Sequence, residues 1–158
     1  MGVAAGVKVR RARPDDAAVV AAVWWRARLD AVPEIPAPVH NEDDVVRWVA
    51  NVLVPAGATW VAVEGDEGVA MMTLRDGWID QLYVDPSWQG RGVGTRLVEL
   101  AQSRARGGLD LWAFQAHTGA RRFYERHGFS AVETTDGENE EGAPDVHYRW
   151  AGTAPATA

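Results

Sequence analysis

Three strand-like segments joined by two tight turns occupy the middle of the chain. The first two, Thr59–Glu64 and Val69–Arg75, flank the turn sequence Gly65–Gly68, and Asp76–Gly77 leads into the third, Trp78–Val84. Glycine and aspartate supply the backbone conformations that hairpin turns require, so these segments predict an antiparallel meander. A meander at this position argues against a doubly wound, all-parallel sheet, whose strands would alternate with helices.

Helices and further strands surround the meander. Pro14 and the two carboxylates after it suit the first turn of one helix, and Asn41 can cap a second. The other elements that the sequence predicts are strands over Val7–Arg13, Leu109–Phe114, Phe129–Thr135 and Val146–Trp150 and helices over Gly92–Arg106 and His117–His127. We therefore expect a single α/β domain over residues 7–150, with a mixed, mostly antiparallel central sheet flanked by helices. Residues 1–6 and 151–158 are small-residue tails that we expect to be disordered.

Charge and composition exclude several kinds of function. The net charge of −6 leaves no excess of cations for nucleic acid. Cysteine is absent, which excludes disulfides, iron–sulfur clusters and a cysteine nucleophile, and the four histidines show no metal-ligand spacing. The longest apolar run, Ala17–Trp25, has nine residues, too few to span a bilayer, and no signal peptide opens the chain. We expect a cytoplasmic protein with no metal, no nucleic-acid partner and no membrane contact.

A glycine-rich segment follows the meander and leads into an amphipathic helix. Glycines let a backbone approach a ligand closely, and the free N–H groups at a helix start carry a partial positive charge, so this pattern favours phosphate binding. The candidate binding residues are Gln89, Gly90, Arg91, Gly92, Val93, Gly94 and Thr95. The segment lacks the Lys-Ser/Thr pair of a mononucleotide P-loop and the third glycine of a dinucleotide fingerprint. A nucleotide-binding protein, or a turn that only tightens the strand-to-helix connection, remains an alternative.

A second motif joins the glycine-rich segment to a known family. The family's glycine loop reads Gln/Arg-x-x-Gly-x-Gly/Ala, which Gln89, Gly92 and Gly94 match. Its second signature reads Asn-x-x-Ala-x-x-Phe-Tyr-Glu-x-x-Gly-Phe, and the residues that match it here are Ala120, Phe123, Tyr124, Glu125, Gly128 and Phe129. The two together resemble the GCN5-related N-acetyltransferase (GNAT) superfamily, and the closing segment Asn139–Trp150 resembles the C-terminal end of a bacterial branch of small GNAT proteins. His117 stands where the family often has Asn.

This resemblance implies a mode of binding for acetyl-CoA. The pyrophosphate would lie on the amides of Gln89–Thr95. The sheet would be splayed in the middle, so that the pantetheine arm pairs with exposed strand backbone like an added strand. The residues that would contact this arm are Leu82, Tyr83, Val84 and His117. A backbone N–H near a bulge at Val84 would polarise the thioester carbonyl.

The resemblance also implies direct acetyl transfer to an amine, without a covalent enzyme intermediate. Tyr124 would be the general acid beside the sulfur, because a tyrosine stays protonated at neutral pH; the alternative is a packed core tyrosine. Asp80 is our candidate for the general base, and the alternative is a strand-face carboxylate held by cross-strand hydrogen bonds. His117 and Glu34 are weaker candidates for the base.

The acceptor site is expected between the first two helices, the proline-rich loop that joins them and the late hairpin. Trp24 or Trp25 would line it or take part in a homodimer contact, unless both pack in the core. The five carboxylates of Asp136–Asp145 would attract a cationic amine, unless they form only a solvated loop. We therefore expect an acetyl-CoA-dependent N-acetyltransferase acting on a small-molecule or peptide amine. The alternative is a non-catalytic acyl-CoA-binding or regulatory module.

Overall fold

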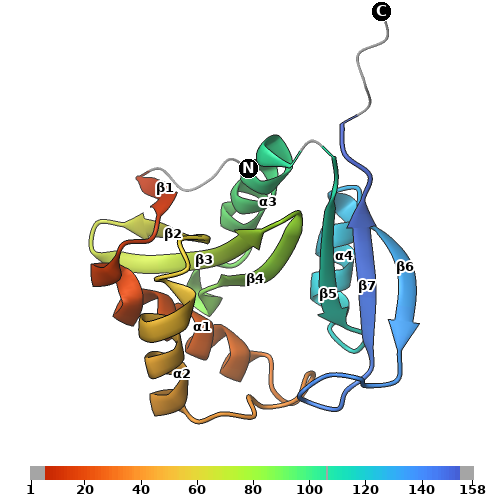
Figure 1. Ribbon diagram of the computed structural model, residues 1–158, viewed down its shortest axis with the longest axis horizontal. Coiled ribbons are helices and arrows are strands. Elements are labelled where there is room, and N and C mark those ends of the chain that lie inside the picture. Colours follow the sequence, from red (N-terminus) through yellow and green to blue (C-terminus); the bar gives the residue numbers. More distant parts are fainter. Residues whose placement is uncertain (1–5, 106, 154–158) are drawn as a thin grey trace, which may run out of the picture.

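The computed structural model describes residues 6–105 and 107–153. Its strands form a seven-stranded sheet in the order β1-β2-β3-β4-β5-β7-β6 (Figure 1). The strands are β1 (Val7–Arg11), β2 (Thr59–Glu64), β3 (Glu67–Arg75), β4 (Trp78–Val84), β5 (Leu109–Phe114), β6 (Ser130–Thr135) and β7 (Asp145–Trp150). The helices are α1 (Ala17–Asp30), α2 (Glu42–Trp48), α3 (Val93–Arg104) and α4 (Thr118–Arg126), with short helical turns η1 (Pro14–Asp16), η2 (Val49–Leu53) and η3 (Pro86–Trp88). The α/β class is confirmed, whereas most of the two tails, residues 1–5 and 154–158, lies outside the described residues.

The sheet consists of two antiparallel halves that meet at one point. Strands β1 to β4 form the first half, and β5, β7 and β6 form the second. The halves join through the parallel neighbours β4 and β5, which align only at Trp78 and Asp110. There the Asp110 N–H donates to the Gly77 carbonyl at 2.8 Å. Beyond this pair the two strands diverge (Figure 1), which confirms the expected splay in the middle of the sheet.

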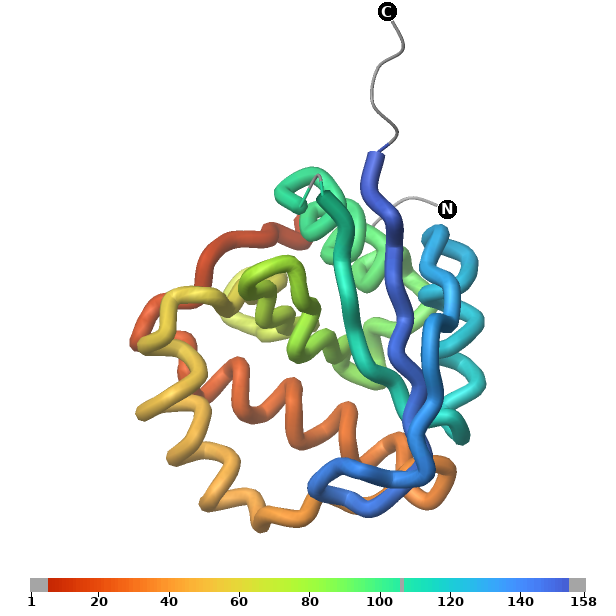
Figure 2. Tube along the Cα trace, turned by 45° about the vertical axis from the view of Figure 1, so that its right-hand side comes forward, coloured from red at the N-terminus to blue at the C-terminus, as the bar shows by residue number. Residues whose placement is uncertain are grey.

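Helices cover both faces of the first half but one face of the second. Along β3 successive side chains alternate, so that Met71 packs with α1 and α2 while Met72 packs with α3. Helix α4 shares the core of α3 and lies behind β5 and β7 (Figures 1 and 2). On the opposite face of β5 the Trp112 side chain is exposed. The molecule is therefore open on the side of the second half that faces α1 and α2.

The start of α2 was predicted correctly from the sequence, but the side chains that its C-terminal end buries were not. The Asn41 side chain accepts a hydrogen bond from the Asp44 N–H at 2.8 Å, which confirms the predicted cap of α2. The helical spacing of Val45, Trp48, Val49 and Val52 predicts that they share one face of the helix after Asn41, but Val52 is 58% exposed. The chain winds into a π-helical turn at Val49–Leu53, and this wider turn rotates Val52 out to solvent.

Candidate active site

The splay between β4 and β5 opens a groove of about 1280 Å³. It runs from the glycine-rich turn before α3, past the N-terminus of α4, to the loop between β6 and β7. The predicted site residues that line it are Asp80, Leu82, Tyr83, Val84, Gln89, Gly90, Gly92, Gly94, Thr95, His117 and Tyr124. Two of the predicted side chains do not line the groove. The Arg91 guanidinium lies over the Trp88 ring, 4.5 Å from its centroid, and the Val93 side chain is buried in the core. Val93 therefore has only its backbone N–H to offer a ligand.

The glycine-rich turn leaves the start of α3 open. Gly90 and Gly92 adopt positive φ angles of 76° and 83°, which glycine tolerates without strain. Gly92 is the N-cap and has no side chain, so no side-chain bond satisfies the first N–H groups of the helix. A Cβ on Gly94 would lie 3.2 Å from Phe123 Cζ, so glycine there lets α3 pack closely on α4. These open amides and the helix dipole fit the pyrophosphate of acetyl-CoA.

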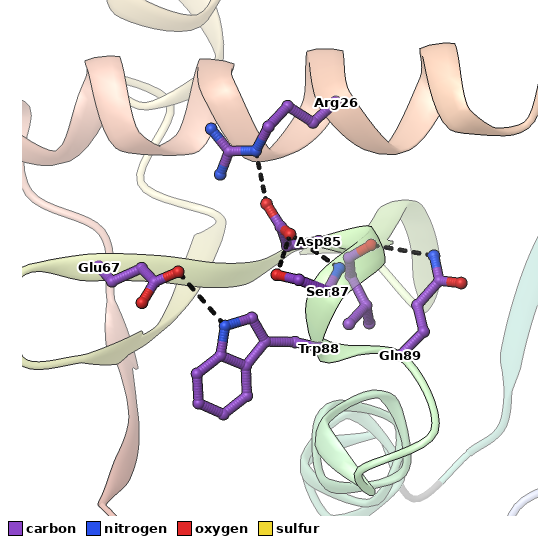
Figure 3. A network of polar contacts seen from close by, with 7 residues as sticks. Arg26, Glu67, Asp85, Ser87, Trp88 and Gln89 are labelled. Carbon is purple, nitrogen blue, oxygen red and sulfur yellow. Dashed lines mark hydrogen bonds and ion pairs between the residues drawn. The ribbon is translucent and has the colours of Figure 1, made fainter.

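A polar network holds this turn in place (Figure 3). The Asp85 carboxylate accepts hydrogen bonds from the Ser87 N–H at 3.0 Å and the Ser87 hydroxyl at 2.7 Å, and pairs with Arg26 Nε at 2.5 Å. Burial acts to raise the pKa of Asp85, but the bonds from Ser87 and the charge of Arg26 outweigh it and lower the pKa. Gln89 Nε2 donates to the Val84 carbonyl at 3.2 Å, which ties the turn back to the end of β4. The loop is thus positioned before any ligand binds.

The edge of β4 that faces the groove lacks a strand partner beyond Trp78, within the part of the chain that the structure describes. Backbone groups of Leu82, Tyr83 and Val84 along this edge are therefore open to an extended ligand. The expected bulge at Val84 is wrong, since Val84 pairs in register with Ala70. The register instead shifts further back along β4, around Asp80.

Asp80 is the extra residue of that bulge. Gln81 pairs with Thr73 and Ile79 pairs with Leu74, which leaves Asp80 without an opposite residue on β3. Its side chain is about one-third exposed (35%) and forms an ion pair with Arg75, Nη2 to Oδ2, at 3.2 Å. The carboxylate thus lies at the groove with its charge partly compensated.

Tyr124 lies on α4 with its ring packed edge-on against Phe123 and Phe129. Burial raises the pKa of its phenol above the ordinary value, so it is protonated at neutral pH. Its hydroxyl makes no hydrogen bond to any described residue, unlike that of Tyr148, which donates to Glu125 at 2.8 Å and accepts from Arg121 at 3.0 Å. Tyr124 is therefore a buried proton donor at the wall of the groove without a protein acceptor.

The N-terminus of α4 forms the opposite wall. His117 is its N-cap residue, and burial lowers the pKa of the imidazole, an effect that Glu34 opposes and Arg28 reinforces. The Glu34 carboxylate accepts hydrogen bonds from the Thr118 N–H at 3.1 Å and the Thr118 hydroxyl at 3.3 Å. Glu34 therefore caps α4 from the proline-rich loop.

A second cavity of about 540 Å³ lies between α1, α2 and the loop that joins β6 to β7. Trp24, Trp48 and Phe114 form its apolar walls, and Trp24 Nε1 donates to Gln81 Oε1 at 3.0 Å. The residues that line both this cavity and the groove are Asp80, Gln81, Tyr83, Phe114 and Glu141. The two spaces therefore meet at the middle of β4. The second cavity occupies the region that the sequence predicted for the acceptor.

Two arginines near the site have roles that the sequence motifs did not indicate. Arg96 in the first turn of α3 donates from Nη1 to the Val7 carbonyl at 2.7 Å and so anchors β1. Arg28 lines the second cavity although it interrupts the apolar face of α1. The sequence shows Arg28 only as the second of two arginines, after Arg26, that follow the tryptophans of this helix.

Within residues 6–105 and 107–153, no group of three or more His, Cys, Asp or Glu residues has an arrangement that would hold a metal ion. None of the described helices has the length and apolar character needed to cross a membrane.

Comparison with known proteins agrees with this architecture. Residues 55–131 match the sequence model of the Acetyltransferase (GNAT) domain. The chain is 31% identical over 127 residues to the peptidyl-lysine N-acetyltransferase YjaB of Salmonella typhimurium, covering 80% of this chain and 85% of that protein. The solution structure of apo-form YjaB from Escherichia coli has a TM-score of 0.75 at 28% identity and covers 93% of this chain and 99% of that chain. The structure of YncA from S. typhimurium with acetyl-CoA shares the fold, with a TM-score of 0.72 at 15% identity, and covers 96% of this chain and 97% of that chain.

The splayed mixed sheet is an architecture that the chain shares with solved acetyltransferases of this fold. The chain belongs to the GNAT family. The resemblance seen in the two sequence motifs is thereby confirmed, and the protein is an acyltransferase with acetyl-CoA as its acyl donor.

Proposed function

We propose that the protein transfers an acetyl group from acetyl-CoA, held in the groove, to a primary amine that enters through the second cavity. The observation that carries this proposal is the meeting of the two cavities at Asp80, Gln81 and Tyr83. A donor on one side of β4 and an acceptor on the other would bring the reacting atoms together there. Holding two reactants in such proximity is a large part of catalysis by direct transfer.

The groove binds its ligand mainly through backbone. The N–H groups at the start of α3 bind the pyrophosphate, and the open edge of β4 at Leu82–Val84 pairs with the pantetheine arm. When bound, acetyl-CoA supplies an activated acetyl thioester. His117 borders the arm and stays neutral at pH 7, because burial lowers its pKa.

Tyr124 donates the proton that the departing sulfur requires. Its hydroxyl is protonated at neutral pH and lines the groove. A thiol has an ordinary pKa near 8.5, so a nearby proton donor makes the sulfur a better leaving group.

Asp80 removes the proton from the incoming amine. An alkylamine with an ordinary pKa near 10.4 is mostly protonated at pH 7 and must lose a proton before it attacks. Asp80 lines both cavities. Its carboxylate is therefore within reach of an amine at their junction, either directly or through one water. His117 is the rival base, because its imidazole is neutral and lines the groove.

The amine that we propose is the side chain of a lysine in a peptide or protein. The relatives at 31% and 34% identity are named peptidyl-lysine N-acetyltransferases. The second cavity also suits a lysine side chain, since aromatic walls accommodate the methylene stem and Asp80 and Glu141 at its inner end attract the ammonium.

A thioester-cleavage assay tests the function. CoA release would be measured with acetyl-CoA and four acceptor classes: lysine peptides, peptide N-termini, polyamines and free amino acids. We expect lysine peptides to be acetylated on the side chain, as seen by mass spectrometry. CoA binding without release with any acceptor would instead support the non-catalytic acyl-CoA-binding module.

A further inference from the structure

Arg28 is a buried cation at the wall of the second cavity. It lies in the last turn of α1 and is 4% exposed. Its guanidinium is 5.4 Å from the centroid of the Trp24 ring and 5.7 Å from that of Phe114. These two aromatic side chains exclude water from the guanidinium and hold it beside the cavity.

The hydrogen bonds of Arg28 are incomplete. Nη2 donates to the Pro36 carbonyl at 2.9 Å, but Nε is buried and finds no acceptor among the described residues. A guanidinium carries five N–H donors, and an unmet buried donor is costly. The C-terminal end of the α1 dipole stabilises a cation there, but that general field does not replace a hydrogen-bond acceptor at Nε.

The charge of Arg28 is also uncompensated. Within residues 6–105 and 107–153, no carboxylate lies within 4.0 Å of its guanidinium. Of the carboxylates around the cavity, Asp44 pairs with Arg47, Asp80 with Arg75 and Glu140 with His40. Glu141 makes no ion pair with a described residue, and it too lies beyond 4.0 Å of the Arg28 guanidinium. A buried charge without a partner destabilises a fold, so its place at a cavity wall points to an anion that arrives with a ligand.

We propose that Arg28 binds a carboxylate of the acceptor, so that the acceptor carries an anionic group close to the amine that becomes acetylated. This inference rests on the proposed function, because it takes the second cavity to be the acceptor site. A planar guanidinium held between aromatic rings suits bidentate pairing with a carboxylate. Glu141 at the inner end would face the amine, so the cavity offers opposite charges to the two ends of such an acceptor.

Two sources could supply this carboxylate. One is an acidic side chain beside the lysine in a peptide, and the other is the α-carboxylate of a C-terminal or free lysine. Both present the same chemistry to Arg28, and matched acceptors distinguish them.

Steady-state kinetics on acceptor pairs tests the proposal in the wild type. One pair is Nα-acetyl-lysine and its carboxamide, and the other is a lysine peptide with Glu or Gln next to the lysine. We expect kcat/KM to favour the carboxylate member of at least one pair roughly 10- to 100-fold, mainly through KM. Whichever pair shows the preference identifies the source. Equal kcat/KM within both pairs would overturn the proposal.

Variants separate an anion-binding role from a merely structural one. Arg28→Met should abolish the preference by slowing only the carboxylate acceptor, while Arg28→Lys should keep part of it. If the hydrogen bond of Arg28 to Pro36 had only a structural role, Arg28→Met would instead slow both members of a pair equally. Arg47→Met is the matched control, because Arg47 is an exposed cation near the same cavity and should leave the preference unchanged.

A binding measurement keeps this test independent of turnover. Calorimetry would follow Nα-acetyl-lysine and its carboxamide binding to the CoA-saturated wild type and to Arg28→Met. Preferential carboxylate binding that Arg28→Met removes, in a protein without turnover, would support the anion site and refute the proposed function. Turnover without any such preference, in either kinetics or binding, would refute the anion site alone.

Discussion

The groove that we propose for the donor and the cavity that we propose for the acceptor are built in different ways, although they share the middle of β4. The groove offers mainly backbone: the glycine turn, the first amides of α3 and the open edge of β4. The second cavity offers side chains from five separate segments, among them Trp24, Arg28, Trp48 and Glu141. A backbone site tolerates sequence change as long as the turn geometry is kept. A side-chain site can change its ligand with a single substitution. We therefore expect the acyl donor to be common to the family and the acceptor to differ from protein to protein.

The largest expected effect comes from the single side chain that we assign to proton donation within the groove. Tyr124→Phe should lower kcat roughly 100-fold or more, as expected for loss of a general acid. The affinity for CoA in calorimetry should stay unchanged, because binding depends on backbone.

Tyr148→Phe is the control for this variant. It also removes a hydroxyl from a buried tyrosine nearby, but Tyr148 bonds to Glu125 and Arg121 and does not line the groove. It should lose stability and keep kcat. If the kcat of Tyr124→Phe stayed within twofold of the wild-type value, Tyr124 would be a packed core residue and not the general acid.

At the junction of the two regions, Asp80→Asn should lower kcat/KM by roughly 10- to 100-fold at pH 7. The loss should shrink as pH rises toward the ordinary amine pKa near 10.4, because the acceptor then arrives already deprotonated. A pH–rate profile of kcat/KM measures this.

His117→Gln is the comparison for the base. If it showed the pH-dependent loss and Asp80→Asn did not, the base would be His117. Glu99→Gln, a change at an exposed carboxylate on α3, should leave the profile unchanged.

Within the groove, Gly90→Ala should weaken CoA binding by roughly 10-fold, because a Cβ would stand where the backbone meets the pyrophosphate. Gly57→Ala is a matched control: the two glycines have φ angles of 76° and 77°, and a Cβ at either would meet no atom within 4 Å. Both variants should lose about 1 kcal/mol of stability from the left-handed backbone. If calorimetry gave the same CoA affinity for Gly90→Ala and Gly57→Ala, the pyrophosphate would not bind at this turn.

The smallest effect concerns the network that supports the groove. The lowered pKa of Asp85 means that its stabilising contribution is present above the unfolded pKa near 3.9 and is lost as pH falls through the folded pKa. Asp85→Asn should therefore cost about 1–2 kcal/mol in urea unfolding at pH 7, and the difference from the wild type should narrow toward pH 3. Asp66→Asn in the exposed β2–β3 turn should show no such dependence. A difference that stayed constant with pH would contradict the role of the Asp85 charge.

The same contrast explains what could be predicted from the sequence. The groove residues Gln89, Gly92 and Gly94 form one contiguous motif, and their local geometry follows from glycine and helix physics. The bounds of β2, β4 and β5 also agree with those expected, because turn residues flank each strand. The bulge at Asp80 was not predictable, since it depends on how β3 and β4 pair across the sheet. Arg28 was missed for a related reason: its neighbour Phe114 on β5 is distant in the sequence.

One expectation stays open, the homodimer. The second half of the sheet carries exposed apolar side chains, such as Val132 on β6 and Trp112 on β5. Light scattering during size-exclusion chromatography would measure whether two copies pair.

The most direct measurement is a crystal structure with a bisubstrate analogue in which the sulfur of CoA is joined through an acetyl group to the side-chain nitrogen of Nα-acetyl-lysine. The predicted result places the pyrophosphate within hydrogen-bond distance of the first amides of α3, and the lysine in the second cavity beside Trp24. A pyrophosphate bound elsewhere, or a lysine that leaves across the open face at Trp112, would contradict a transfer between these two cavities.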